Sequence, residues 1–176
     1  MLSIKEPLGK FELTMAAITL ALLVWMVVAP FTLPHGSVED LSGAIGPIDN
    51  SDQIGEMNMF AQGIYYLGDM NCHQIDERSY FLNGNEMPVC ARDLGMFVGL
   101  PIGFLLCFAL PLRPKLSLVI LTVLPMGIDG GLQAVTSYES FNLLRFVTGT
   151  LGGLAVAFFL VMVAGEMYKD SERPDI

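Results

Sequence analysis

The chain has 176 residues, of which 53% are hydrophobic and 15% charged, and its net charge at pH 7 is -9. So large an apolar fraction excludes an ordinary soluble enzyme of this length. The excess of acidic residues excludes a nucleic-acid-binding protein, because such proteins use positive charge to hold the phosphate backbone. The three cysteines are too few for a disulfide-dense secreted scaffold.

Four apolar runs are each long enough for a helix to cross about 30 Å of hydrocarbon. They cover 13–31, 94–112, 116–135 and 146–165. Because the runs lack the alternation of barrel strands, we expect an all-α membrane protein with four transmembrane helices in a single domain, 1–176. The first run is expected to be a retained span, since Pro30, Phe31 and Thr32 make a poor signal-peptide cleavage site.

The basic residues predict the orientation of the chain in the cell membrane. Most of them flank the two chain ends and the short turn between the second and third runs: Lys5, Lys10, Arg113, Lys115, Lys169 and Arg173. Because basic residues are enriched in cytoplasmic loops, both termini are expected in the cytoplasm. The long 32–93 connection is then an outer, extracytoplasmic loop.

The outer loop is predicted to have two parts. Residues 33–55 are rich in Pro, Gly, Ser and Asp, which favours irregular chain. Apolar residues then recur at helical spacing and predict one short helix: Met57, Phe60, Ala61, Ile64 and Tyr65. This helix could lie in the membrane interface or pack as a cap on the bundle, and the sequence leaves both alternatives open.

Small residues predict which spans meet. Glycines recur at four-residue spacing in the second and fourth spans: Gly95, Gly99 and Gly103, then Gly149 and Gly153. Such spacing lets helix backbones approach closely in lipid, so we expect these two spans to pack tightly.

The unusual polar residues all fall in the outer loop or near the outer ends of the spans, so we expect them to share one pocket. Asp129 stands out because a carboxylate inside a span costs on the order of 3 kcal/mol and needs a partner. Arg92 and Arg145 are candidate partners, and Gln133 lies one turn further on the same face. An ion pair that only orders the bundle is the alternative to a functional role.

Three arginines, Arg78, Arg92 and Arg145, lie on the side that basic residues usually avoid. A guanidinium group offers a rigid fork of donors suited to phosphate or carboxylate, so the three could hold a lipid headgroup. The alternative is that each pairs with a nearby acid of the chain: Asp93, Asp129 or Glu139.

Cysteine and histidine suggest a second kind of site. Cys72, His73, Cys90 and Asp93 carry the ligand atoms that zinc prefers. An extracytoplasmic compartment favours a Cys72–Cys90 disulfide over metal. His73 would then be a candidate general base or acid, or a structural residue bonded to a loop carbonyl. Cys107, within the second span, is expected to be a buried, inert thiol.

Several motifs together resemble a known family. They are Cys72-His73-Gln74, Cys90-Ala91-Arg92-Asp93, Asp129-Gly130, and Asn142 with Arg145 and Thr148-Gly149. The set is similar to a family of small predicted membrane proteins of archaea and bacteria that carries a domain-of-unknown-function label, over about residues 70–153. Relatives often have Cys-Ala-Arg-Cys where this chain has Asp93, which weakens a thiolate-rich metal site here. The resemblance implies a polytopic membrane protein and one shared polar site, without naming an activity.

These observations predict an integral membrane protein whose outward-facing pocket binds an anionic lipid-like or phosphorylated ligand. The expected pocket residues are His73, Arg78, Arg92, Asp93, Asp129, Gln133, Asn142 and Arg145. If the protein is an enzyme, His73 or Asp129 would act as base in hydrolysis or transfer at the headgroup. A structural or assembly subunit of a membrane complex, or a homo-oligomer, is the first alternative, and a zinc-dependent membrane hydrolase is the second. Zinc is the one cofactor considered.

Overall fold

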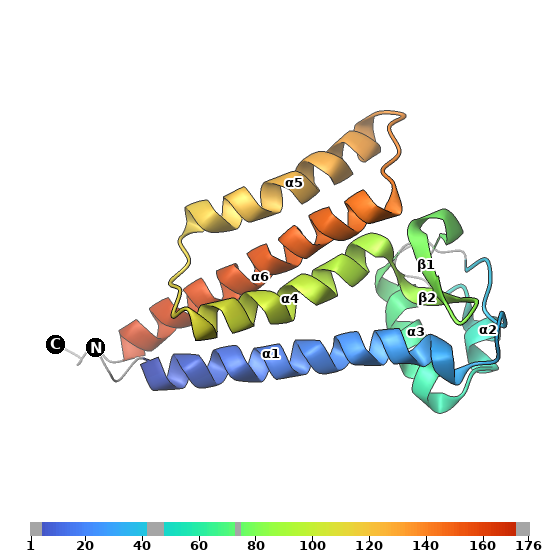
Figure 1. The fold of residues 1–176 in the computed structure, drawn as a ribbon, viewed down its shortest axis with the longest axis horizontal. Helices are drawn as coiled ribbons and strands as arrows, with labels where there is room; N and C mark the ends of the chain where they lie inside the picture. The colour runs from blue at the N-terminus through green and yellow to red at the C-terminus, as the bar shows by residue number, and fades with distance from the viewer. Residues whose placement is uncertain (1–4, 42–47, 73–74, 172–176) are drawn as a thin grey trace.

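Four long helices lie side by side along the molecule in the computed structural model, which describes residues 5–41, 48–72 and 75–171 (Figure 1). They are α1 (Lys5–Val28), α4 (Ala91–Ala109), α5 (Leu116–Val135) and α6 (Asn142–Ser171). A short 3₁₀ turn, η1 (Ala29–Thr32), continues α1. All four helices are long and apolar enough to cross a membrane, so the predicted all-α membrane fold with four spans is confirmed.

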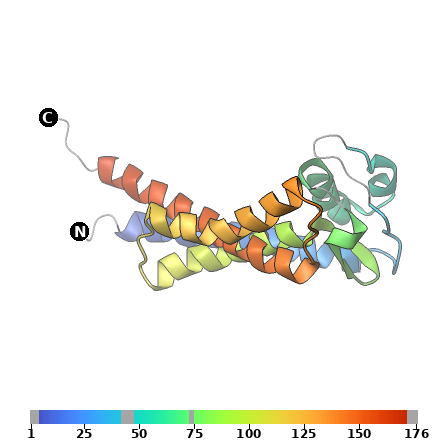
Figure 2. The same cartoon turned by 90° about the horizontal axis from the view of Figure 1, so that it is seen from above.

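The two ends of the bundle differ in what they carry. The turn between α4 and α5 lies at the same end as the beginning of α1 and the end of α6, whereas the α5–α6 connection and the long loop lie at the other (Figures 1 and 2). We call the latter the loop end. The first turns of α4 and α6 and the last turn of α5 reach it, which brings distant parts of the sequence together there.

Helices α4 and α6 pack most closely because glycines face each other across their contact. A Cβ atom added at Gly99 would lie 2.1 Å from the carbonyl oxygen of Thr150, and one added at Gly153 would lie 2.1 Å from that of Met96. Any side chain larger than hydrogen would therefore force the two backbones apart. The predicted tight contact between the second and fourth spans is confirmed.

Helix α5 is set apart from the rest of the bundle and contacts mainly α6 (Figures 1 and 2). Asp129 is its one buried residue. Leu121, Ile128 and Val135 are among its many exposed apolar residues, at 66%, 53% and 80% exposure. Such a surface is suited to lipid rather than water, as expected for a membrane span.

The long loop contains more regular structure than the sequence indicated. Two helices, α2 (Ser51–Gly55) and α3 (Met59–Asn71), are followed by a 3₁₀ turn, η2 (Asp76–Arg78). Strands β1 (Ser79–Leu82) and β2 (Asn85–Cys90) then form an antiparallel hairpin. Its two-residue turn places Asn83 and Gly84 at φ 55° and 73°. Asn-Gly is the favoured pair for such a turn, so the missed hairpin did have a local sequence signal.

Helix α3 is the helix that the apolar spacing predicted, and its inner face packs as a cap. Ala61, Ile64 and Tyr65 are fully buried against the hairpin and the end of α1. The indole of Trp25 donates a hydrogen bond to the carbonyl oxygen of Phe60 at 2.8 Å. Phe60, which the same spacing places on the apolar face, is 47% exposed.

Two buried polar residues fix the hairpin to the rest of the loop. The Asn85 amide donates to the carbonyl oxygens of Pro30 and Pro34 at 2.9 and 3.0 Å, and its oxygen accepts from the backbone of Ser37 and Val38. Next to it, buried Glu86 accepts a hydrogen bond from the backbone of Leu41 at 2.9 Å. These bonds hold β2, which leads directly into α4 at Cys90.

Candidate functional site

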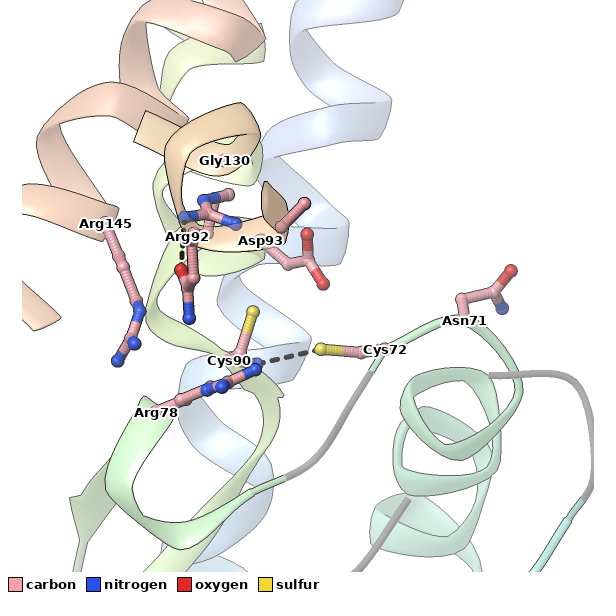
Figure 3. A pocket seen from close by; sticks show the side chains of 10 residues that line it. Asn71, Cys72, Arg78, Cys90, Arg92, Asp93, Gly130 and Arg145 are labelled. Carbon is pink, nitrogen blue, oxygen red and sulfur yellow. Dashed lines mark hydrogen bonds between the residues drawn. The ribbon is translucent and has the colours of Figure 1, made fainter. Parts of the chain in front are cut away.

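A cavity of about 460 Å³ lies at the loop end, between the hairpin and the ends of α3, α4, α5 and α6. Side chains from segments far apart in the sequence line it, and three are arginines (Figure 3). The lining residues are Asn71, Cys72, Arg78, Cys90, Arg92, Asp93, Gly130, Gln133, Ala134 and Arg145. We call this space the arginine cavity.

Arg92, in the first turn of α4, forms the strongest ion pair of the site. Its Nη2 atom lies 2.6 Å from Oδ2 of Asp129, and the same nitrogen donates to Oε1 of Gln133 at 3.3 Å. Tyr138 donates a further hydrogen bond to Oδ1 of Asp129 at 3.2 Å. The partner that Asp129 requires inside a span is therefore Arg92 rather than Arg145, the other candidate.

Arg145, near the start of α6, is 4% exposed. It donates hydrogen bonds to the carbonyl oxygen of Glu77 at 3.4 Å and to Oδ1 of Asn142 at 3.1 Å, and both acceptors are uncharged. Among the described residues, no carboxylate lies within ion-pair distance of it. A buried cation thus faces the cavity without an ion-pair partner among the described residues, and Glu139 stabilises it only from beyond ion-pair distance.

Arg78 gives the cavity its third positive charge. It pairs with Glu139 at 3.4 Å, but the Glu139 side chain is 75% exposed, so solvent weakens this interaction. The lining has three arginines against one carboxylate, Asp93. Asp129 and Glu139 pair with Arg92 and Arg78 from outside the lining, so the positive charge is concentrated at the cavity wall while the site as a whole has three arginines and three carboxylates.

Cys72, Cys90 and Asp93 form a compact group in the wall of the arginine cavity. Their ligand atoms all lie within 4.8 Å of one another. The backbone N–H of Cys90 also donates to Sγ of Cys72 at 3.2 Å (Figure 3). Two thiolates and a carboxylate are a donor set that zinc accepts, and water could occupy a fourth position. The group could therefore hold a metal.

Both cysteines are free thiols in the structure, so the favoured Cys72–Cys90 disulfide is not formed in it. Their closeness keeps that bond as a prediction for an oxidising compartment. The pKa of Cys90 is lowered, chiefly by its hydrogen bond with Cys72 and further by backbone amides of Arg92 and Asp93. The pKa of Cys72 is raised by the same bond and by burial. Cys90 is thus the thiol that ionises first.

The structure brings most of the predicted site residues together at the loop end. Arg78, Arg92, Asp93, Gln133 and Arg145 line the cavity with the two cysteines.

Asn142 supports the site rather than lining it. It donates to the carbonyl oxygen of Ser79 at 3.1 Å and accepts from Arg145, so it ties α6 to the hairpin and orients the guanidinium. Asp129 lies behind Arg92 as its ion-pair partner. His73, predicted as a base and as a metal ligand, lies outside the described residues. The sequence analysis missed Tyr138, whose position in a loop gave no signal for its bond to Asp129.

Comparison with known proteins matches residues 72–159, half of the chain, to a family model described as "Predicted membrane protein (DUF2085)". The chain belongs to the DUF2085 family. The matched segment contains every residue that lines the arginine cavity except Asn71. The resemblance inferred from the motifs is therefore confirmed at the level of the family.

Two archaeal relatives of the DUF2085 chain support the match. An uncharacterised protein of Methanocaldococcus jannaschii is 35% identical over 129 residues, which cover 66% of this chain and 81% of the relative. An uncharacterised protein of Methanothermobacter thermautotrophicus is 37% identical over 89 residues, covering 49% of this chain and 80% of the relative. No solved structure matches the chain.

Proposed function

We propose that this integral membrane protein binds an anionic phosphate group in the arginine cavity, and that the loop end faces the outside of the cell. The phosphate could belong to a membrane lipid headgroup or to a small phosphorylated compound. The observation that carries the proposal is Arg145, which is 4% exposed and has no carboxylate partner among the described residues.

Burial of an uncompensated cation is costly. The effective penalty for a buried ion is several kcal/mol, and Arg145 recovers part of it from two neutral oxygens. An anion in the cavity would supply the ion-pair partner that Arg145 lacks among the described residues. Nε of Arg92 is also buried without a hydrogen-bond partner in that part of the chain, so a second guanidinium can donate to a ligand.

The geometry also suits phosphate better than a single carboxylate. Arg78, Arg92 and Arg145 come from η2, α4 and α6 and approach the cavity from different directions (Figure 3). A phosphate group presents several acceptor oxygens and can bond to more than one arginine at once. The volume of about 460 Å³ falls in the range of small-ligand sites, roughly 300–1,000 Å³.

A scaffold role is the alternative that the ion pairs favour, since Arg92–Asp129 and Arg78–Glu139 link α4, α5, η2 and the connection before α6. A scaffold role, however, does not account for a partly enclosed cavity of about 460 Å³ beside a buried arginine that has no ion-pair partner among the described residues. Catalysis is not part of the proposal, because the Asp129 carboxylate is occupied by Arg92 and Tyr138.

The experiment measures binding to the full-length protein purified in detergent. One arm titrates glycerol 3-phosphate and inorganic phosphate by calorimetry, and the other titrates short-chain phosphatidylglycerol by native mass spectrometry. We expect Arg145→Ala to weaken binding by about 10- to 100-fold, the loss of one charge-assisted hydrogen bond. The arm that binds more tightly identifies whether the phosphate comes from a soluble compound or a lipid.

Lys169→Ala is the matched control, because Lys169 is a half-exposed cation on the last turn of α6, at the opposite end of the bundle. We expect it to bind like the wild type. Melting temperatures of the variants check that each one folds. Equal binding by wild type and all three arginine variants, or no binding in either arm, would refute the proposal.

A further inference from the structure

Behind Cys72 lies a second cavity that the proposed phosphate site does not use. It has a volume of about 380 Å³ and lies between α1, α3, β2 and the first half of α4. Its walls are mostly apolar, and they include Leu22, Met26, Ile64, Val89 and Phe97. We call it the apolar cavity.

The two cavities share a wall. Asn71, Cys72 and Asp93 line both of them, whereas Cys90 lines the arginine cavity alone. The Cys72–Cys90 pair therefore stands between a polar space at the loop end and an apolar space beside two membrane spans. Leu22 and Met26 belong to the last two turns of α1, and Phe97 is in the second turn of α4. An occupant of the apolar cavity would thus lie against residues of two membrane spans.

The positions of Cys72 and Cys90 also favour a chemical reaction between the two thiols over a purely structural role. The ligand atoms of Cys72, Cys90 and Asp93 lie within 4.8 Å of one another, so the two sulfur atoms can join after a small adjustment of the side chains. Both cysteines end regular elements, Cys72 at the end of α3 and Cys90 between β2 and α4, where such an adjustment disturbs little backbone structure. Cys107, by contrast, is fully buried within α4.

We propose that Cys72 and Cys90 form a redox-active dithiol that a membrane-soluble quinone oxidises from the apolar cavity. Apolar walls and a volume of about 380 Å³ suit a quinone ring, and a dithiol is the group at the wall that can react with it. In the step, the two thiols lose two electrons and two protons, and one sulfur–sulfur bond forms. The quinone gains the same electrons and protons, so its two carbonyl oxygens become the hydroxyls of a hydroquinone.

A dithiol that reaches Cys90 through the arginine cavity would return the pair to its reduced form by thiol–disulfide exchange. The outside dithiol then becomes a disulfide, and the electrons pass from the loop end to the lipid phase. This inference does not depend on phosphate binding, because it rests on the two sulfur atoms and the apolar cavity, whereas phosphate binding rests on the arginines; the two proposals share the arginine cavity only as the route to Cys90.

The experiment measures the number of free thiols and the reduction of added quinone in the same sample of full-length protein in detergent. Reduced protein is mixed without oxygen with decylubiquinone, whose ring carbons are fully substituted and so resist direct attack by thiols. We expect the three free thiols to fall to one, a disulfide between Cys72 and Cys90 by peptide mapping, and one hydroquinone for each disulfide. Steady turnover with dithiothreitol as electron donor tests the complete cycle.

Variants separate the proposed reaction from nonspecific oxidation. Cys72→Ser and Cys90→Ser should reduce quinone at the uncatalysed background rate, while Cys107→Ser, the matched control, should keep the wild-type rate. Leu22→Trp fills the apolar cavity and should lose most of the quinone-dependent rate. It should still form the disulfide with diamide, a water-soluble oxidant, which shows that the variant folds and keeps its dithiol.

Three results would overturn the inference. Quinone reduction by the Cys72→Ser and Cys90→Ser variants at the wild-type rate would show that the dithiol is not the reductant. A disulfide that forms with diamide but not with decylubiquinone would make the bond structural. Stoichiometric zinc that shields both thiols in the purified protein would assign the group with Asp93 to a metal site instead.

Discussion

Replacement of Gly99 by alanine tests whether the contact between α4 and α6 holds the bundle together. The added Cβ would lie 2.1 Å from the carbonyl oxygen of Thr150, and ordinary contact begins at 3.4 Å. The helices must therefore separate locally by about 1.3 Å, because a backbone carbonyl cannot move aside as a flexible side chain can. Overpacking of this kind typically costs about 1–3 kcal/mol, and we expect a loss of this size in the free energy of unfolding.

Unfolding by titration with a denaturing detergent measures the effect, with helicity followed by circular dichroism. Gly131→Ala is the matched control, because a Cβ atom there meets nothing within 4 Å. Alanine is a better helix former than glycine by about 1 kcal/mol, so the control should be as stable as the wild type or slightly more stable. If Gly99→Ala unfolds at the same detergent fraction as Gly131→Ala, the close approach of α4 and α6 does not determine stability and the reasoning is wrong.

Three further predictions concern buried polar groups. Asp129→Ala should lower the free energy of unfolding by about 1–3 kcal/mol, because it leaves Arg92 without its partner. Glu139→Ala should change that free energy little, because Glu139 is exposed. The same titration with denaturing detergent compares the two variants. Burial raises the pKa of Glu86 above its ordinary value of 4.5, so the protonated form is favoured in the folded protein and stability should fall as pH rises from that ordinary value through the raised pKa. Melting curves over a series of pH values should show this loss, and Glu86→Gln should flatten it. Asn85→Ala removes five hydrogen bonds from the loop and should cost about 3 kcal/mol or more, seen as faster proteolysis of the loop by trypsin.

The spans could be predicted from the sequence because membrane crossing depends on length and hydrophobicity, and both are read directly from it. The contact between α4 and α6 could be predicted as well, since glycine spacing on a helix is a local pattern. The position of Asp129 inside a span indicated that its carboxylate needs a partner, but the sequence offered more than one arginine for that role. The choice of Arg92 depends on how α5 is placed beside α4, and no local pattern encodes that.

The loop was harder to predict because its order comes from long-range contacts. Asn85 bonds to residues about fifty positions away, so nothing near it in the sequence indicates that it is buried. The hairpin did have a local signal in Asn83-Gly84, but Pro88 and the polar residues around the turn hide the alternation that marks a strand. The arginine cavity was predicted as a gathering of polar residues, whereas the apolar cavity depends on how α3 lies against α1 and could not be foreseen.

Helix α5 joins the bundle in an unusual way, because the one residue that it buries is a carboxylate. Most membrane helices are held in a bundle by close packing of their side chains, and that packing does not depend on charge. Here the side chain that anchors the helix belongs to an ion pair, and its arginine lines the cavity. If the proposed ligand bonded to that arginine, it would compete with Asp129 and weaken the ion pair that joins α5 to α4. Binding in the cavity would then also change how firmly one membrane helix is held.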